Sequence, residues 1–69
     1  MKKINVGIFG PEGRMGKDII SRIKDYKNLK ISALCERKNH PSIGRKVNDC
    51  IITDDVKKLV ECSDVIIDF

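Results

Sequence analysis

The chain has 69 residues, of which 41% are hydrophobic and 35% are charged, and its formal net charge is +4. A chain of this length forms at most one small domain, which buries only about 60% of its unfolded surface. The lysines are dispersed and aromatic residues make up 4% of the chain, so the basic patch and stacking platform of a nucleic-acid-binding protein are missing. No apolar run approaches the roughly 20 residues of a membrane span, and we expect a cytoplasmic protein.

The N-terminal third predicts a strand followed by a helix. Residues 4–9 form a short apolar run that favours a buried parallel strand, and it ends at a glycine-rich turn. From Arg14 the apolar positions Met15, Ile19, Ile23 and Tyr26 recur at helical spacing. This stripe predicts a helix that begins near Arg14 and reaches Tyr26, with Asn28 as its terminator.

The remainder predicts three more strands and one more helix. Residues 30–35 form a second strand that ends at Glu36, residues 37–49 form a polar loop with at most a helical turn, and residues 51–53 form a third strand. Asp54 is the expected N-cap of a helix that carries Val56, Leu59 and Val60. Residues 65–69 form a final strand of the buried type.

This order, β-α-β-β-α-β, predicts an α/β fold: one mononucleotide-binding half of a Rossmann-type parallel sheet. Because crossovers between parallel strands are right-handed, the first strand should be central, with the second strand on one side and the last on the other. The last strand would then be an open apolar edge. We therefore expect residues 1–69 to be the N-terminal portion of a dinucleotide-binding domain, truncated from a longer protein.

The most informative motif is the turn itself, in which three glycines recur with a spacing of three. It reads Gly10-Pro11-Glu12-Gly13-Arg14-Met15-Gly16. The usual fingerprint is G-x-G-x-x-G, so the first spacing departs from it. A glycine turn between a strand and a helix directs backbone N–H groups and the positive helix end toward a bound pyrophosphate. Gly10 can take a positive φ, Gly13 lets the backbone approach phosphate, and Gly16 allows close helix-to-strand packing.

An acidic residue stands where a ribose-binding carboxylate is expected. Glu36 lies 20 positions after Gly16, the distance at which a carboxylate accepts hydrogen bonds from the adenosine ribose and favours NADH. Arg37 follows it and can pair with a 2′-phosphate, which favours NADPH. The two residues together indicate NADPH or NADH as the cofactor without choosing between them. Charged loop residues that only face solvent are the alternative interpretation.

The cysteines and the single histidine indicate no metal site. Cys35, Cys50 and Cys62 contain no C-x-x-C pair, so neither zinc nor a disulfide framework is predicted. His40 precedes Pro41 in the polar loop, and we interpret it as a surface histidine rather than a metal ligand or catalytic base.

The glycine turn, with its Arg14-Met15 pair, resembles the G-x-x-G-R-M-G motif of the dihydrodipicolinate reductase family. Glu36-Arg37 is similar to the Glu-Arg pair that ends the family's second strand, Ile43-Gly44 to its Leu-Gly element, and residues 65–69 to its I-D-F-T strand end. Where small residues are common in the family, this chain has Pro11 and Glu12, and Glu12 places a carboxylate near phosphate unless Arg14 or Lys17 offsets it.

The resemblance implies the chemistry and the assembly of the full-length protein. The implied reaction is NAD(P)H-dependent reduction of a cyclic imine-type dicarboxylate in the diaminopimelate route to lysine, by a homotetramer with a separate substrate-binding domain. The implied pyrophosphate-binding residues are Gly10, Pro11, Glu12, Gly13, Arg14 and Met15. Glu36 would meet the adenosine ribose, Arg37 a 2′-phosphate, and Phe69 would begin the nicotinamide-side loop. No residue matches the family's catalytic motif, so we expect these residues alone to be inactive, with no catalytic residue among them.

Two other functions fit the residues. The first is a different Rossmann NAD(P)-dependent dehydrogenase, because the glycine turn occurs in many such enzymes. The second is a non-catalytic nucleotide-sensing module, since nucleotide-binding folds also serve as binding domains.

Overall fold

The computed structural model describes residues 3–68, which form one sheet with two helices. The elements in chain order are β1 (Ile4–Phe9), α1 (Arg14–Ile23), β2 (Leu29–Cys35), β3 (Lys46–Val47), β4 (Cys50–Thr53), α2 (Val56–Glu61) and β5 (Val65–Asp68). The five strands follow the order β3-β4-β2-β1-β5. β1, β2, β4 and β5 are parallel, and β3 is antiparallel to β4. The predicted half of a Rossmann-type sheet, with β1 between β2 and β5, is confirmed.

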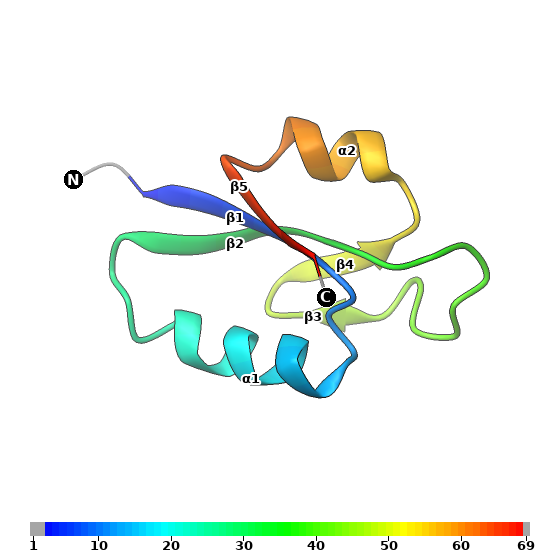
Figure 1. Cartoon of the computed structure of the whole chain (residues 1–69), viewed down its shortest axis with the longest axis horizontal. Helices are drawn as coiled ribbons and strands as arrows, with labels where there is room; N and C mark the ends of the chain where they lie inside the picture. Colours follow the sequence, from blue (N-terminus) through cyan, green and yellow to red (C-terminus); the bar gives the residue numbers. More distant parts are fainter. Residues whose placement is uncertain (1–2, 69) are drawn as a thin grey trace.

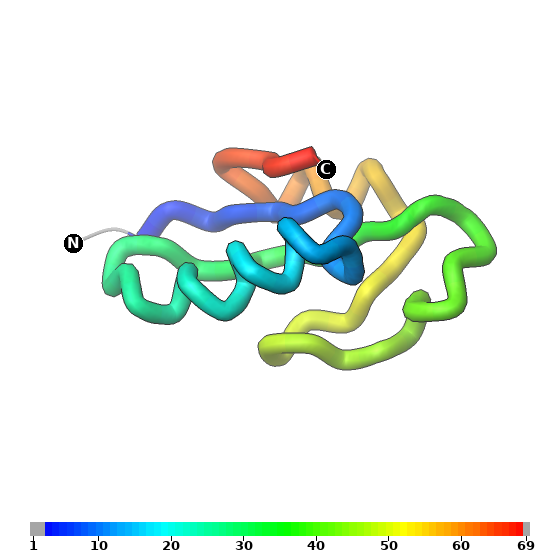
Figure 2. The backbone as a smooth tube through the Cα atoms, turned by 60° about the horizontal axis from the view of Figure 1, so that its bottom comes forward, coloured from blue at the N-terminus to red at the C-terminus, as the bar shows by residue number. Residues whose placement is uncertain are grey.

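The two helices lie on opposite faces of the sheet (Figures 1 and 2). The chain moves from β1 to β2 through α1, and then back across the sheet from β4 to β5 through α2. Right-handed crossovers in opposite directions place their helices on opposite faces. The core lies mainly beneath α1, where Ile8, Leu34 and Ile52 are almost completely buried, and Ile23 packs against them from the helix.

The other face depends on a glycine that the sequence analysis did not single out. Gly7 is buried in β1, and a Cβ built there would overlap the Ser63 hydroxyl and lie 2.8 Å from Leu59 Cδ1. Because a side chain at Gly7 would collide with both, its absence lets α2 and the segment after it approach the centre of the sheet.

Helix α1 is shorter than predicted. It ends at Ile23, and the N–H groups of Asp25 and Tyr26 donate to the carbonyls three residues earlier, at 3.0 and 2.9 Å. Such bonds tighten a helix end, and the chain then turns toward β2. Tyr26 therefore lies beyond the helix and is 58% exposed, so the prediction of a helix that reaches Tyr26 and is terminated by Asn28 was wrong.

The predicted loop over residues 37–49 contains a strand that the sequence analysis missed. Lys46 and Val47 pair with Ile51 and Cys50 of β4 across a two-residue turn. The turn residues, Asn48 and Asp49, have φ values of 53° and 67°. A tight hairpin needs positive φ at both positions, which asparagine and aspartate tolerate better than most residues.

The predicted cap of α2 is wrong by one residue. Asp55, not Asp54, precedes the helix with an extended backbone, and its Oδ1 accepts a 3.1 Å hydrogen bond from the Lys58 N–H. β5 forms the edge of the sheet, and Val65 and Ile66 on it are 50% and 40% exposed. Phe69, the predicted start of the nicotinamide-side loop, lies outside the described residues.

Candidate nucleotide-binding site

The glycine turn and the end of β2 are neighbours at the carboxyl edge of the sheet. The Gly10 N–H donates to the Cys35 carbonyl at 3.0 Å, and the Glu36 N–H donates to the Thr53 carbonyl at 2.7 Å. Both bonds continue the strand ladder past the last strand residues. They place Gly10 and Glu36 side by side where parallel α/β sheets bind ligands.

The turn has the backbone conformation that its glycines predict. Gly10 has φ +85°, in the left-handed region that favours glycine. A Cβ on Gly16 would lie 2.6 Å from the Gly10 carbonyl oxygen, so Gly16 lets α1 pack closely against the turn. The sequence analysis had predicted close packing against a strand instead. On Gly13, by contrast, a Cβ would have Gly10 O at 3.6 Å as its one neighbour within contact range, so this side of the turn is open.

Helix α1 begins at the turn without a side-chain cap. Its first backbone bond runs from the Lys17 N–H to the Gly13 carbonyl at 2.9 Å. Within residues 3–68, the N–H groups of Arg14 and Met15 have no hydrogen-bond acceptor, as expected for a first helical turn. These free donors, together with the positive end of the helix dipole, suit a phosphate group.

A concavity of about 480 Å³ lies between the turn and the end of β2. Its lining residues are Gly10, Glu12, Gly13, Arg14, Met15, Glu36, Arg37 and His40. It therefore brings together every residue predicted for the cofactor site except Pro11, which is buried and lines a different hollow with Lys17 and Ile20. The exposed guanidinium groups of Arg14 and Arg37 add positive charge at its rim.

Glu36 is the buried charged residue of this concavity, with 6% of its surface exposed. Its Oε2 accepts a long, 3.5 Å hydrogen bond from the Glu12 N–H of the glycine turn. The carboxylate thus contacts the glycine turn directly. In the sequence, only the spacing between Gly16 and Glu36 relates the two motifs, whereas in the structure a hydrogen bond joins them.

The Glu12 side chain is held by two cations. Its carboxylate lies 3.5 Å from Lys17 Nζ and 3.4 Å from Arg45 Nη1, and the side chain is 16% exposed. Of the two residues that the sequence analysis named as able to offset this charge, Lys17 pairs with it, whereas Arg14 forms no ion pair with it among the described residues. Arg45 was missed, because 33 positions separate it from Glu12 and no spacing rule connects a turn with a distant loop.

His40 is not the solvent-facing histidine that the sequence analysis predicted. Its side chain is 18% exposed and its Nε2 lies 4.0 Å from Glu36 Oε2. On the other side of the ring, Nδ1 accepts from the Ser42 N–H at 3.1 Å and lies 2.7 Å from the Ser42 hydroxyl. The turns of the 37–45 loop carry His40 into the concavity, and local sequence gives no sign of this fold-back.

Comparison with known proteins identifies the family of this chain. Residues 4–69 match the family described as "Dihydrodipicolinate reductase, N-terminus". The chain belongs to the dihydrodipicolinate reductase family. It is 42% identical over 66 residues to the 4-hydroxy-tetrahydrodipicolinate reductase of Campylobacter curvus, and 41% identical over 69 residues to that of Pelagibacter ubique.

These two alignments cover 96% and 100% of this chain but 25% and 26% of the relatives, so the chain spans about a quarter of their length. Among solved structures, the dipicolinate-bound dihydrodipicolinate reductase from Paenisporosarcina sp. TG-14 superposes with a TM-score of 0.75 at 21% identity. That match covers 97% of this chain and 28% of the solved one, and it shows the shared fold.

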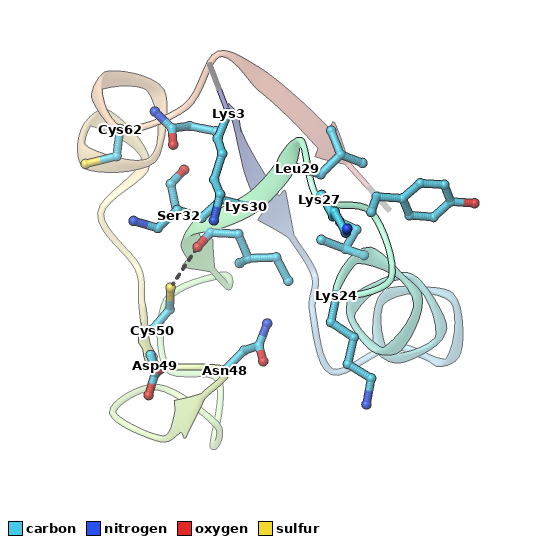
Figure 3. A pocket seen from close by; sticks show the side chains of 14 residues that line it. Lys3, Lys24, Lys27, Leu29, Lys30, Ser32, Asn48, Asp49, Cys50 and Cys62 are labelled. Atoms are coloured by element: carbon cyan, nitrogen blue, oxygen red, sulfur yellow. Dashed lines mark hydrogen bonds between the residues drawn. The ribbon is translucent and has the colours of Figure 1, made fainter. Parts of the chain in front are cut away.

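In this member of the dihydrodipicolinate reductase family a larger concavity, of about 830 Å³, lies at the other end of the sheet (Figure 3). Its wall includes the lysines Lys3, Lys24, Lys27 and Lys30, and Cys50, whose thiol donates to the Ile31 carbonyl at 3.5 Å. It lies at the amino ends of β1 and β2, away from the carboxyl edge where such sheets bind ligands. The smaller concavity is therefore the candidate site of this family member.

The buried Cys35 lies beside the site, where its carbonyl accepts from the Gly10 N–H. Burial, with a smaller contribution from the carboxylates of Asp54, Asp55 and Glu36, raises the pKa of the Cys35 thiol, which keeps it protonated. Over residues 3–68, no group of three or more histidine, cysteine or acidic side chains is arranged to hold a metal ion. In the same range neither helix is long and apolar enough to cross a membrane.

Proposed function

We propose that the protein containing this chain is an NAD(P)H-dependent reductase that converts 4-hydroxy-tetrahydrodipicolinate to tetrahydrodipicolinate. The chain would supply the adenosine and pyrophosphate half of the cofactor site. The family membership supports the reaction, and relatives named 4-hydroxy-tetrahydrodipicolinate reductase support the substrate. The residues that bind the dicarboxylate and build a homotetramer would lie in the further length that those relatives have.

The observation that carries the cofactor proposal is the position of Glu36. A carboxylate that is 6% exposed, at the end of β2 and in contact with the glycine turn, requires a compensating partner. A ribose diol is such a partner, because its two hydroxyl groups donate to the carboxylate oxygens. Alongside, the free N–H groups of Arg14 and Met15 fit the pyrophosphate.

The bound cofactor supplies the chemistry, a hydride carried by its nicotinamide ring. The residues of this chain bind and orient. The glycines of the turn from Gly10 to Gly13 let the phosphates approach the backbone closely, and Glu36 binds the ribose at the adenosine end of the cofactor. Arg37, which is exposed and lines the same concavity, would pair with the 2′-phosphate when NADPH is bound.

The test is a titration of the protein at its full natural length with NADH and with NADPH, combined with a reductase assay. Glu36→Gln keeps the side-chain shape and removes the charge, so we expect at least tenfold weaker NADH binding, because hydrogen bonds to charged groups contribute about 1.5–3 kcal/mol. NADPH should be affected less, since the repulsion of its 2′-phosphate also disappears. Glu61→Gln, an exposed carboxylate at the end of α2, is the matched control.

The outcomes separate the candidate functions. Unchanged affinity for both cofactors in Glu36→Gln would contradict the proposed site. Cofactor binding without consumption of NAD(P)H on addition of 4-hydroxy-tetrahydrodipicolinate would instead favour another dehydrogenase or a nucleotide-sensing module.

A further inference from the structure

The two heteroatoms that face each other in the concavity are Nε2 of His40 and Oε2 of Glu36, 4.0 Å apart. This distance is too long for a direct hydrogen bond. Both side chains nevertheless form part of the same wall, and both are mostly buried, at 18% and 7% exposure. A donor and an acceptor at this separation can hold a small polar group between them.

The hydrogen bonds of Ser42 determine which atom of His40 carries the proton. A backbone N–H can only donate, and the Ser42 N–H points at Nδ1 at 3.1 Å, so Nδ1 is an acceptor. The Ser42 hydroxyl, 2.7 Å from the same nitrogen and on a residue that is 4% exposed, can donate to it as well. In the neutral ring the proton is therefore on Nε2, and it faces the Glu36 carboxylate.

The 37–45 loop holds this ring in place by its own backbone bonds. The His40 N–H donates to the Arg37 carbonyl at 3.2 Å, and the His40 carbonyl accepts from Ile43 at 3.1 Å. The imidazole is thus fixed at its backbone and at Nδ1, which leaves Nε2–H as the one group of the ring free to serve a ligand.

A hydroxyl group fits this arrangement because it both donates and accepts. With each hydrogen bond about 2.8 Å long, an oxygen that bridges a donor and an acceptor 4.0 Å apart makes an angle of about 90° between the two bonds. Glu36 Oε2 keeps a lone pair for it beside the bond from the Glu12 N–H, and Oε1 remains available for a second hydroxyl.

We propose that His40 is a cofactor-binding residue: its Nε2–H and Glu36 Oε2 together bind one hydroxyl of the adenosine ribose. This rests on the proposed function, because it takes the ligand to be a nicotinamide dinucleotide. His40 adds to the carboxylate a donor that recognises the hydroxyl oxygen, so the hydroxyl is recognised through both its hydrogen and its lone pair.

The experiment uses the protein at full natural length and measures the affinities for NADH and for its analogues that lack the 2′- or the 3′-hydroxyl of the adenosine ribose. His40→Asn keeps an acceptor at the position of Nδ1 for the Ser42 N–H but removes the donor at Nε2. His40→Gln places an amide donor near the position of Nε2. The pair separates the contact with the ligand from the support of the loop.

For the wild-type protein we expect one of the two deoxy analogues to bind about tenfold more weakly than NADH, or worse. In His40→Asn this penalty should shrink by roughly threefold or more, because the hydroxyl has lost one of its two partners, and His40→Gln should restore most of it. An equal loss of affinity for NADH and both analogues in His40→Asn, without rescue by His40→Gln, would overturn the proposal and leave His40 as a loop support. A wild-type protein that binds neither NADH nor NADPH would overturn the proposed function itself, and the role of His40 with it.

Discussion

Gly16 in the first turn of α1 lies directly against the carbonyl oxygen of Gly10. A Cβ on Gly16 would lie 2.6 Å from that oxygen and 2.9 Å from Pro11 Cα. The atoms in the way are backbone, which cannot move aside as a flexible side chain does. We therefore expect Gly16→Ala to shift the turn and to lower the free energy of unfolding by about 1–3 kcal/mol, the usual cost of overpacking.

Gly13→Ala is the matched comparison. Gly13 has φ −69°, so alanine is not strained there, and its Cβ would meet Gly10 O at an ordinary 3.6 Å. Thermal unfolding should thus be nearly unchanged in Gly13→Ala, whereas NADH binding should weaken, because the added methyl group occupies the space where phosphate approaches. If Gly16→Ala unfolds at the wild-type temperature, the close approach does not limit this turn.

Arg37 is expected to decide the discrimination between NADPH and NADH. It is exposed at the rim of the concavity next to the buried Glu36. Removal of a charge-assisted contact with a 2′-phosphate costs about 1.5–3 kcal/mol. Arg37→Ala should therefore weaken the binding of NADPH roughly 10- to 150-fold and the binding of NADH far less. Calorimetric titration with both cofactors measures this, with the exposed neighbour variant Lys38→Ala as control. Equal weakening of both cofactors would show that Arg37 does not contact the 2′-phosphate.

Glu12 links the glycine turn to α1 and to the 37–45 loop, but it also places a negative charge near the proposed pyrophosphate site. Its carboxylate pairs with Lys17 on α1 and with Arg45 in the 37–45 loop, at 3.5 and 3.4 Å. We expect Glu12→Gln to lower the free energy of unfolding by less than about 1 kcal/mol, since both cations are well exposed.

The same substitution should strengthen the binding of both cofactors, because it removes a negative charge near the pyrophosphate and frees two cations to face it. This gain should shrink as salt is added, since screening weakens interactions between exposed charges. Titrations of Glu12→Gln and wild type at low and high ionic strength test this, and weaker binding at every salt concentration would contradict it.

The residues whose place in the concavity could be predicted from sequence are those fixed by local structure. Gly10 needs a positive φ for its own turn, and Glu36 follows its strand at a spacing set by one β-α-β unit, so the sequence alone predicts that both lie at this edge of the sheet. His40 and Arg45 could not, because their roles depend on how the 37–45 loop folds back on the turn. No periodicity or spacing carries that information.

The same distinction explains the errors in the fold. The strands were predicted from short apolar runs bounded by polar or glycine-containing segments, and such runs carry their own signal. The short strand at Lys46 was missed because a two-residue strand has too few residues for a pattern, and its pairing depends on the turn at Asn48 and Asp49. The end of α1 was placed too late because Tyr26 continued the apolar spacing, although tertiary packing stops at Ile23.

Asp54 and Asp55 provide a test of which residue caps α2. Asp55 accepts from the Lys58 N–H at 3.1 Å, and Asp54 makes no such bond. We expect Asp55→Ala to lower the free energy of unfolding by about 1 kcal/mol, the typical loss of an N-cap, and Asp54→Ala to have little effect. Hydrogen exchange at the Lys58 amide should accelerate only in Asp55→Ala. The reverse pattern would mean that the helix begins one residue earlier.

Cys35 should make the protein less stable in alkaline solution. Its side chain is completely buried, and burial raises its pKa above the ordinary value of 9.0, helped by nearby carboxylates. Above that ordinary value the unfolded chain loses the thiol proton while the folded chain keeps it, so the unfolded state binds fewer protons and is favoured as pH rises. The stability that the neutral buried thiol contributes is therefore fully present at lower pH and is lost as pH climbs toward the raised pKa, at up to about 1.4 kcal/mol per pH unit.

Denaturant unfolding of wild type and Cys35→Ala between about pH 8 and about pH 10 measures this contribution. This pH range spans the onset of thiol ionisation in the unfolded chain. We expect Cys35→Ala to be less stable at the lower pH, because it loses buried atoms, but to lose less stability as pH rises. Leu34→Val, a comparably buried position without a titratable group, should show a packing loss with the full wild-type slope. If the free energies of unfolding of wild type and Cys35→Ala fell in parallel with rising pH, the thiol would ionise as readily in the folded protein as in the unfolded chain. That result would contradict the raised pKa expected from burial of Cys35 at the end of β2.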